Sequence, residues 1–168
     1  RGKDDYKATK PKQIVSIDLQ GPFTKSCQGN EYNMLLVDYF SKFSVSIPVA
    51  NKQSATIIKA LKKYFLYHGT PEVLRSDRGG EFQNDDMTDF LVKHKIRQRL
   101  TAPYSPSTNG LVEVRNRIFL NTARALISDA DKSDLFNASK NWDLAIEYTT
   151  YIHNRVKSRN NAKTPHES

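Results

Sequence analysis

The sequence predicts an α/β domain built on a mixed five-stranded sheet with helices against it. Short β-branched, apolar segments are followed by longer segments in which apolar residues recur every three or four positions. Three strand-like segments come first, and the later ones alternate with helical segments, an order that indicates a mixed sheet covered by helices. With 168 residues, 38% of them hydrophobic, the chain is long enough for one core, and we expect a single domain.

The first three expected strands form an antiparallel meander. The segment from Ile14 to Leu19 is β-branched and apolar, as in a buried strand. Gly29-Asn30 is a turn signal, and residues 32–40 then read as a second strand. A short Ser41-Lys42 connection leads to a third strand over residues 43–49.

Helices and strands alternate in the middle of the chain. Ser54 is expected to cap a helix that ends at Gly69 and Pro71. Val73 and Leu74 form a short strand, and Met87, Phe90 and Leu91 mark a second helix. Residues 96–100 supply the fifth strand.

Two further helices complete the expected fold. Residues 102–110 are rich in Pro, Ser and Gly and predict a loop. A long helix should follow, from about Thr108 or Leu111 to Ser128. We expect its buried face to carry Leu111, Val114, Ile118, Thr122, Ala125 and Leu126, and its opposite face to carry Glu113, Arg117 and Arg124. The last helix should run from about Lys140 to Arg155, with core contacts from Trp142, Ala145, Ile146, Tyr148 and Ile152.

Composition indicates an anionic partner. The 26 Lys and Arg residues exceed the 18 Asp and Glu residues and give a net charge of +8, which favours nucleic acid binding. A membrane is not the expected partner, because the chain lacks a long apolar run and its first twelve residues are polar. Cys27 is the only cysteine, which excludes an internal disulfide and fits a reducing compartment. One cysteine and four scattered histidines give no zinc-site pattern.

Three acidic residues stand out by their local sequences. Asp18 lies in IVSIDLQGPF, Asp77 in LRSDRGGEF and Glu113 in SPSTNGLVEVRNR. Asp18 falls near the end of an apolar strand, where a charge is costly unless it is paired or liganded. Asp77 directly follows a short strand, and strand ends are the usual ligand sites of α/β sheets. If the helix of Glu113 packs beside the first and fourth strands, the three carboxylates converge.

Such a trio suits metal-dependent phosphoryl transfer. Carboxylates from distant segments can hold two Mg²⁺ ions, about 3.5–4 Å apart, which clamp the attacking and leaving oxygens of a phosphodiester. Each acid alone has an ordinary alternative: a strand-end turn for Asp18, an Asx turn for Asp77, and an i,i+4 pair with Arg117 for Glu113. Taken together with their flanking residues, the three favour catalysis.

Five residues are candidates for touching DNA. Arg117 and Arg124 share the helix face of Glu113, and Tyr104, Ser105 and Asn109 lie in the preceding loop. The alternative for these residues is a solvated helix face and an ordinary polar loop.

The ordered segments IDLQGPF, YNMLLVDYFSKF, HGTPEVLRSDRGGEF and TAPYSPSTNGLVEVRNR resemble the catalytic core of retroviral and LTR-retrotransposon integrases of the DDE type along nearly the whole chain. The 35 residues between Asp77 and Glu113 belong to the same resemblance. The carboxy-terminal stretch is similar to copia-type elements and the middle equally to gypsy-type elements. The resemblance implies a ribonuclease H-like fold in which Asp18, Asp77 and Glu113 bind two Mg²⁺ ions, for which Mn²⁺ can substitute.

The resemblance also implies an activity and its setting. The expected reactions are 3′-end processing of retroelement DNA and its strand transfer into host DNA, by a homo-oligomer in the nucleus or in a preintegration particle, with a host tethering factor as a further partner. Residues 1–12 would be a basic linker from a zinc domain, and residues 13–168 the core. The alternatives are a catalytically silent, domesticated core that binds DNA or chromatin, a bacterial-type DDE transposase, and a ribonuclease H relative that cleaves RNA in hybrids.

Two departures from the family pattern concern DNA contacts rather than the triad. Pro106-Ser107 stands where family members usually have Pro-Gln or a related pair. Val114 follows Glu113, and Arg115 comes only after it, whereas the family usually places Arg directly after the catalytic Glu.

Overall fold

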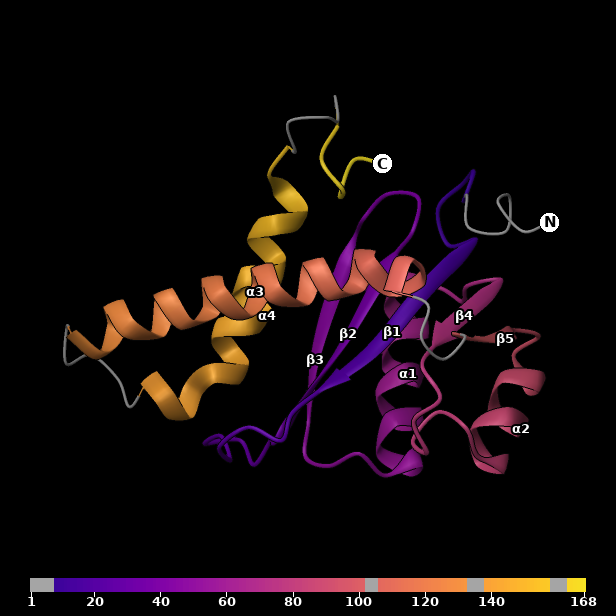
Figure 1. Ribbon diagram of the computed structural model, residues 1–168, viewed down its shortest axis with the longest axis horizontal. Coiled ribbons are helices and arrows are strands. Elements are labelled where there is room, and N and C mark those ends of the chain that lie inside the picture. The colour runs from indigo at the N-terminus through magenta and orange to yellow at the C-terminus, as the bar shows by residue number, and fades with distance from the viewer. Residues whose placement is uncertain (1–7, 102–105, 133–137, 158–162) are drawn as a thin grey trace.

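A computed structural model describes residues 8–101, 106–132, 138–157 and 163–168, although the side chains of residues 106–110, 130–132 and 138–139 fall outside the description. Its centre is one five-stranded sheet (Figure 1). The strands are β1 (Ile14–Gln20), β2 (Tyr32–Asp38), β3 (Ser44–Val49), β4 (Val73–Ser76) and β5 (Arg97–Leu100), in the spatial order β3-β2-β1-β4-β5.

The pairing confirms the predicted mixed sheet. β1, β2 and β3 form an antiparallel meander, and β4 and β5 extend the sheet in the direction of β1. Parallel strands need a crossover, and α1 (Ser54–His68) and α2 (Asp85–Lys93) supply the two crossovers. Gln53, rather than the predicted Ser54, is the N-cap of α1, and the Ser54 hydroxyl donates instead to Asp86 of α2, at 3.2 Å.

Apolar side chains cover both faces of the sheet, because neighbouring residues of a strand point to opposite sides. Met34 and Leu36 of β2 belong to the core under α1 and α2. Leu35 and Val37 belong to a second core under α3 (Pro106–Lys132) and α4 (Trp142–Arg155), which lie on the other face. A short 3₁₀ helix (Ala138–Asn141) leads directly into α4 (Figure 1). Within the described residues, no helix is long and apolar enough to span a membrane.

The long helix differs from its prediction in length and in rotation. It begins at Pro106, inside the expected loop, and continues to Lys132. The buried residues in its described part, 111–129, are Val112, Asn116, Phe119 and Ala123. Val114, expected inside, is 43% exposed. In α4, Trp142 and Ile146 are buried as expected, whereas Tyr148 is 56% exposed.

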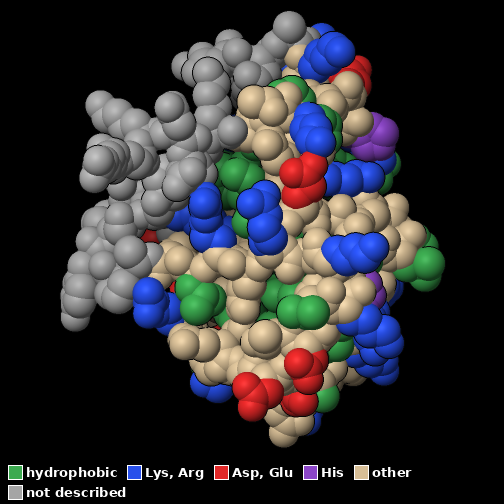
Figure 2. All heavy atoms as spheres, turned by 90° about the vertical axis from the view of Figure 1, so that its right-hand side faces the viewer, with side chains coloured by type: hydrophobic (Ala, Val, Ile, Leu, Met, Phe, Trp, Pro, Cys, Tyr) green, Lys and Arg blue, Asp and Glu red, His purple; other side chains and the backbone are tan. Residues whose placement is uncertain are grey.

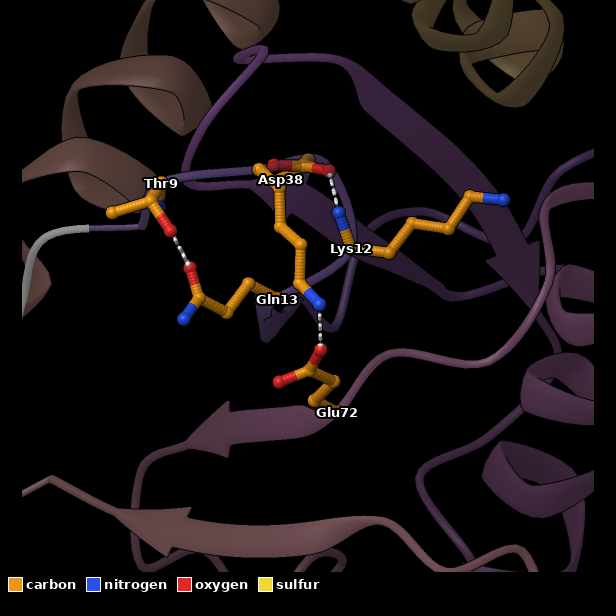
Figure 3. A network of polar contacts seen from close by, with 6 residues as sticks. Thr9, Lys12, Gln13, Asp38 and Glu72 are labelled. Carbon is orange, nitrogen blue, oxygen red and sulfur yellow. Dashed lines mark hydrogen bonds and ion pairs between the residues drawn. The ribbon is translucent and has the colours of Figure 1, made fainter.

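The segment before β1 is held by the carboxylate of Asp38 at the end of β2. One of its oxygens accepts the backbone N–H of Lys12 at 2.6 Å (Figure 3). The other accepts those of Phe40 and Ser41 at 2.7 and 3.3 Å. An exposed ion pair between Lys10 and Glu72, at 2.6 Å, lies beside it. Asp38 therefore has a structural role in this turn. The predicted division between a linker of residues 1–12 and a core of residues 13–168 stays a prediction.

The connection between β1 and β2 is fixed to the start of α4. The buried carboxylate of Asp143 accepts the Ser26 hydroxyl at 2.6 Å and the Asn30 amide at 2.9 Å. The Trp142 indole N–H donates to the Thr24 carbonyl at 2.7 Å. These contacts tie together residues more than a hundred positions apart and hold this connection at the end of β1.

Candidate active site

The sheet places Asp18 next to Asp77. β1 and β4 are parallel, and Ile14, Val15 and Ser16 pair with Val73, Leu74 and Arg75 at a constant offset of 59 residues. The same offset leads from Asp18 to Asp77, which directly follows the end of β4. Since adjacent strands lie about 4.8 Å apart, the two acidic residues come from neighbouring positions at the carboxyl ends of two strands.

The alternation of β1 directs Asp18 toward the long helix. Val15 and Ile17 are buried under α1 and α2, so Ser16 and Asp18 point to the face that α3 covers. The buried amide of Asn116, on α3, donates a short hydrogen bond to the Asp18 carboxylate. This bond joins residues 98 positions apart and fixes the position of α3 over β1.

The carboxyl group of Asp18 has a raised pKa. Burial has the largest effect, and the negative charges of Asp77 and Glu113 add to it, so that the pKa rises from 3.8 to about 6. The hydrogen bonds from the Leu19 backbone and the Asn116 amide act in the opposite direction. Asp18 therefore experiences the charges of both other members of the predicted triad.

A cavity of about 320 Å³ opens beside these residues. Asp18 and Gln20 of β1 line it on one side. The other lining residues all come from α3: Glu113, Asn116, Arg117, Leu120, Asn121 and Arg124. Their spacing of three or four residues is that of one helix flank. The prediction that Glu113, Arg117 and Arg124 share one side of the long helix is thus confirmed.

Asp77 is not part of the cavity lining, although its charge acts on Asp18, which is. Its side chain is exposed, and one carboxylate oxygen accepts the backbone N–H of Gly79 at 2.9 Å. This is the Asx-turn arrangement that the sequence left open as an alternative. Among the described residues, no three carboxylate, histidine or cysteine side chains form a ready metal-binding group.

The available donors nevertheless suit a divalent cation such as Mg²⁺. Asp18, Asp77 and Glu113 offer only oxygen atoms, the ligands that Mg²⁺ prefers. Two further oxygens, Gln20 Oε1 and Asn116 Oδ1, are buried and accept no hydrogen bond from the described residues, and both residues line the cavity. A positive charge here would lower the Asp18 pKa, which burial raises most and the charges of Asp77 and Glu113 raise further.

Sequence reasoning missed Gln20 and Asn116. Gln20 follows Asp18 by two residues and Asn116 follows Glu113 by three, so the periods of a strand and a helix could have pointed to both. All five predicted DNA contacts stay predictions, and three of them cannot be placed by their side chains. Tyr104 and Ser105 lie outside the described residues, and Asn109 belongs to α3, although its side chain is not described.

Charge is unevenly distributed over the molecule. Figure 2 shows the side on which β5 and α2 lie, with several basic side chains and a few acidic ones over its middle and upper parts and a group of acidic ones at its lower end. Asp85, Asp86 and Asp89 of α2 are exposed, and the first two occupy the first helical turn, where negative charge is favourable. These acids stand apart from the residues of the cavity.

The family model for the integrase core domain matches residues 8–106, more than half of the chain. The retrovirus-related Pol polyprotein from transposon 412 of Drosophila melanogaster is 32% identical over 154 residues, which cover 91% of this chain and 12% of that protein. Gypsy retrotransposon integrase-like protein 1 of Homo sapiens is 23% identical over 95% of this chain and 29% of its own length. The chain thus spans only a small part of these relatives.

Solved structures share the fold. The magnesium complex of the HTLV-2 integrase catalytic core, in its trimeric form, has a TM-score of 0.75 and 21% identity, covering 96% of this chain and 98% of that one. Integrase in the simian T-cell lymphotropic virus intasome with PP2A regulatory subunit B56 gamma has a TM-score of 0.77 and 22% identity, covering 94% and 54%. The sheet and its helices are those of the ribonuclease H-like fold, and the chain belongs to the integrase core domain family of retroviruses and LTR retrotransposons.

Proposed function

We propose that this domain is the catalytic core of a retroelement integrase, which processes the 3′ ends of the element's DNA and transfers them into host DNA. The observation that supports this most is the cavity in which Asp18 and Glu113 meet Arg117 and Arg124. Asp77 completes the proposed triad, since its charge acts on Asp18.

The proposed reaction consists of two phosphoryl transfers. In the first, a water oxygen attacks the phosphorus near the 3′ end of the element DNA, and the bond to the 3′ oxygen breaks. In the second, the freed 3′ hydroxyl attacks a phosphorus of the target DNA, and the target's own 3′ oxygen leaves. Two Mg²⁺ ions, held by Asp18, Asp77 and Glu113, would supply activation of the nucleophile and stabilisation of the leaving oxygen. No covalent protein–DNA intermediate is required.

The other cavity residues have supporting roles in this proposal. Asn116 holds the Asp18 carboxylate through its hydrogen bond and limits the rise of its pKa. Arg117 and Arg124 are exposed cations along the same helix flank, where they can bind phosphates of the DNA backbone. Such contacts are salt-sensitive and largely independent of sequence.

The proposed setting follows from the family. The integrases among the structural relatives occur as a dimer, a trimer and an intasome, and one is in complex with a host protein. We propose that this chain also acts as a homo-oligomer on element and target DNA in the nucleus, with a host tethering factor among its partners.

A second candidate function is a catalytically silent core that binds DNA or chromatin. Two observations favour it. Mammalian relatives are named integrase-like proteins, and within the described residues the three acids do not form a closed metal-binding group. Asp77 distinguishes the two functions, because catalysis needs its carboxylate and plain DNA binding does not.

A disintegration assay tests the catalytic proposal. A branched DNA that mimics the strand-transfer product is incubated with the protein in Mg²⁺ or Mn²⁺, and release of the element end is measured. We expect metal-dependent resolution that is lost in Asp77→Asn and retained in Asp89→Asn, which removes an exposed acid from α2. If wild-type protein binds the DNA and yet resolves none, and Mg²⁺ binding is the same in Asp77→Asn, the silent core is the better description.

A further inference from the structure

A second group of basic side chains lies on the other side of α3 from the cavity. A helix turns about 100° per residue, so Arg115 lies roughly 160–200° around α3 from Glu113 and Arg117. Its guanidinium is half-buried, whereas those of Arg117 and Arg124 are exposed. Arg115 is the residue whose position departs from the usual family sequence.

Contacts among α3, α4 and the start of β3 bring His153 and Lys42 toward the side of α3 that carries Arg115. Phe119, one turn beyond Arg115 on α3, packs on the His153 ring of α4, with 5.0 Å between ring centroids. The next residue of α4, Asn154, is buried and makes two hydrogen bonds to the backbone of Ser44 at the start of β3, at 2.9 and 2.7 Å. Lys42 lies two residues before Ser44, in the turn between β2 and β3.

Arg115 acts on Lys42 and on His153 as a nearby like charge does. Burial lowers the pKa of Arg115. Burial also lowers the pKa of Lys42 and of His153, and in both cases the positive charge of Arg115 lowers it further. Arg115 is therefore close to both side chains.

No acidic side chain of the described residues forms an ion pair with these three groups. The carboxylate of Asp38 is near enough to influence Lys42, but its oxygens already accept three backbone N–H groups. The Lys42 ammonium donates to the Tyr39 carbonyl at 2.5 Å, which provides no countercharge. Within the described parts of the chain, Asp38 is therefore the acidic group that acts on this half-buried cluster, it acts on Lys42, and Arg115 and His153 have no acidic partner.

We propose that Arg115, Lys42 and His153 form a binding site for a phosphate group of a DNA backbone, separate from the candidate active site. A guanidinium and an ammonium are the usual phosphate ligands of proteins, and imidazole can donate a third hydrogen bond. A DNA phosphate is favoured as the occupant because the chain carries a net charge of +8. Since the cluster and the cavity lie on opposite flanks of α3, the site would contact a second segment of DNA. This inference does not depend on the catalytic proposal.

Binding of a labelled 30-base-pair duplex, followed by fluorescence anisotropy in EDTA, tests the site. We expect Arg115→Gln to weaken binding about three- to tenfold at 0.1 M salt and to reduce the slope of log K against log salt by about one. Arg97→Gln is the matched control, since Arg97 is an exposed arginine of β5. Lys42→Asn serves as a second variant, because Lys42 has a φ of 65°, in the left-handed region that Asn tolerates.

Two results would overturn the proposal. One is that folded Arg115→Gln and Lys42→Asn both bind the duplex with the affinity and salt slope of the Arg97→Gln control. The other is that inorganic phosphate shifts the NMR signals of the His153 ring while duplex binding stays insensitive to Arg115, which would assign the site to a small phosphate. Because EDTA suppresses metal-dependent catalysis, neither result depends on whether the triad is active.

Discussion

Replacing Asp18 with Asn should stabilise the metal-free protein. The folded chain holds this carboxylate partly buried and near two other negative charges, which raise its pKa from 3.8 to about 6. A difference of about 2 pKa units corresponds to roughly 3 kcal/mol between the folded and unfolded states. Asp18 retains some solvent contact, so we expect about 1–2 kcal/mol, or a rise in Tm of about 3–6 °C for a chain of this size.

The sign of the pH dependence follows from the raised pKa of Asp18. Above pH 6 the folded protein carries the unfavourable charge, and the unfolded chain carries it without penalty. As the pH falls from 6 toward 4, the carboxyl group becomes protonated in the folded state first, and the penalty disappears. The stability difference between Asp18→Asn and wild type should therefore be full at pH 7.5 and nearly absent at pH 4.

Urea denaturation in EDTA at the two pH values measures this difference. Asp89→Asn, which changes an exposed acid of α2, should stay within about 0.5 kcal/mol of wild type at both. Addition of Mg²⁺ should stabilise wild type and leave Asp18→Asn unchanged, because ligand binding to the folded state adds to its stability. If Asp18→Asn is no more stable than wild type at pH 7.5, the burial of the Asp18 charge and its repulsion by Asp77 and Glu113 do not destabilise the folded protein.

Three further substitutions test the structure around the site. Asn116→Ala removes a hydrogen bond that lowers the Asp18 pKa, so the acidic limb of a pH–activity profile should move to higher pH. Asp143→Ala leaves the buried side-chain donors of the β1–β2 connection unpaired and should cost about 2–4 kcal/mol in urea denaturation. Asp38→Ala should cost a similar amount and speed hydrogen exchange at the Lys12 amide, whereas unchanged exchange there would show that Asp38 does not hold the segment before β1.

The strands were predictable because the local conformational preference of their residues agrees with their burial in the folded sheet. β2 has buried apolar residues on both faces, and the turn signals around it fall outside the paired residues. The mixed topology followed from the order of the segments alone. Asp18 and Asp77 could likewise be placed at strand ends, because strand ends are visible in the sequence.

The contacts that hold the site together were not predictable in this way. Asn116 bonds Asp18 across 98 positions, and Asp143 bonds Ser26 across 117. Buried polar residues look like surface residues in a hydrophobic pattern, so neither Asn116 nor Asp143 could be recognised as interior. Their partners become evident only once the chain is folded.

The rotation of α3, and with it the position of Glu113, depends on the buried polar residue Asn116. The predicted stripe centred on Ile118 and the observed one, which contains Asn116, differ by roughly 100° around the helix, about one residue step. With the predicted rotation Glu113 would point away from the sheet, where it could not share a cavity with Asp18. With the observed rotation Glu113 and Arg117 flank the buried face on one side and Arg115 flanks it on the other. A polar residue that a hydrophobic pattern assigns to solvent therefore sets which side of the helix meets the candidate active site.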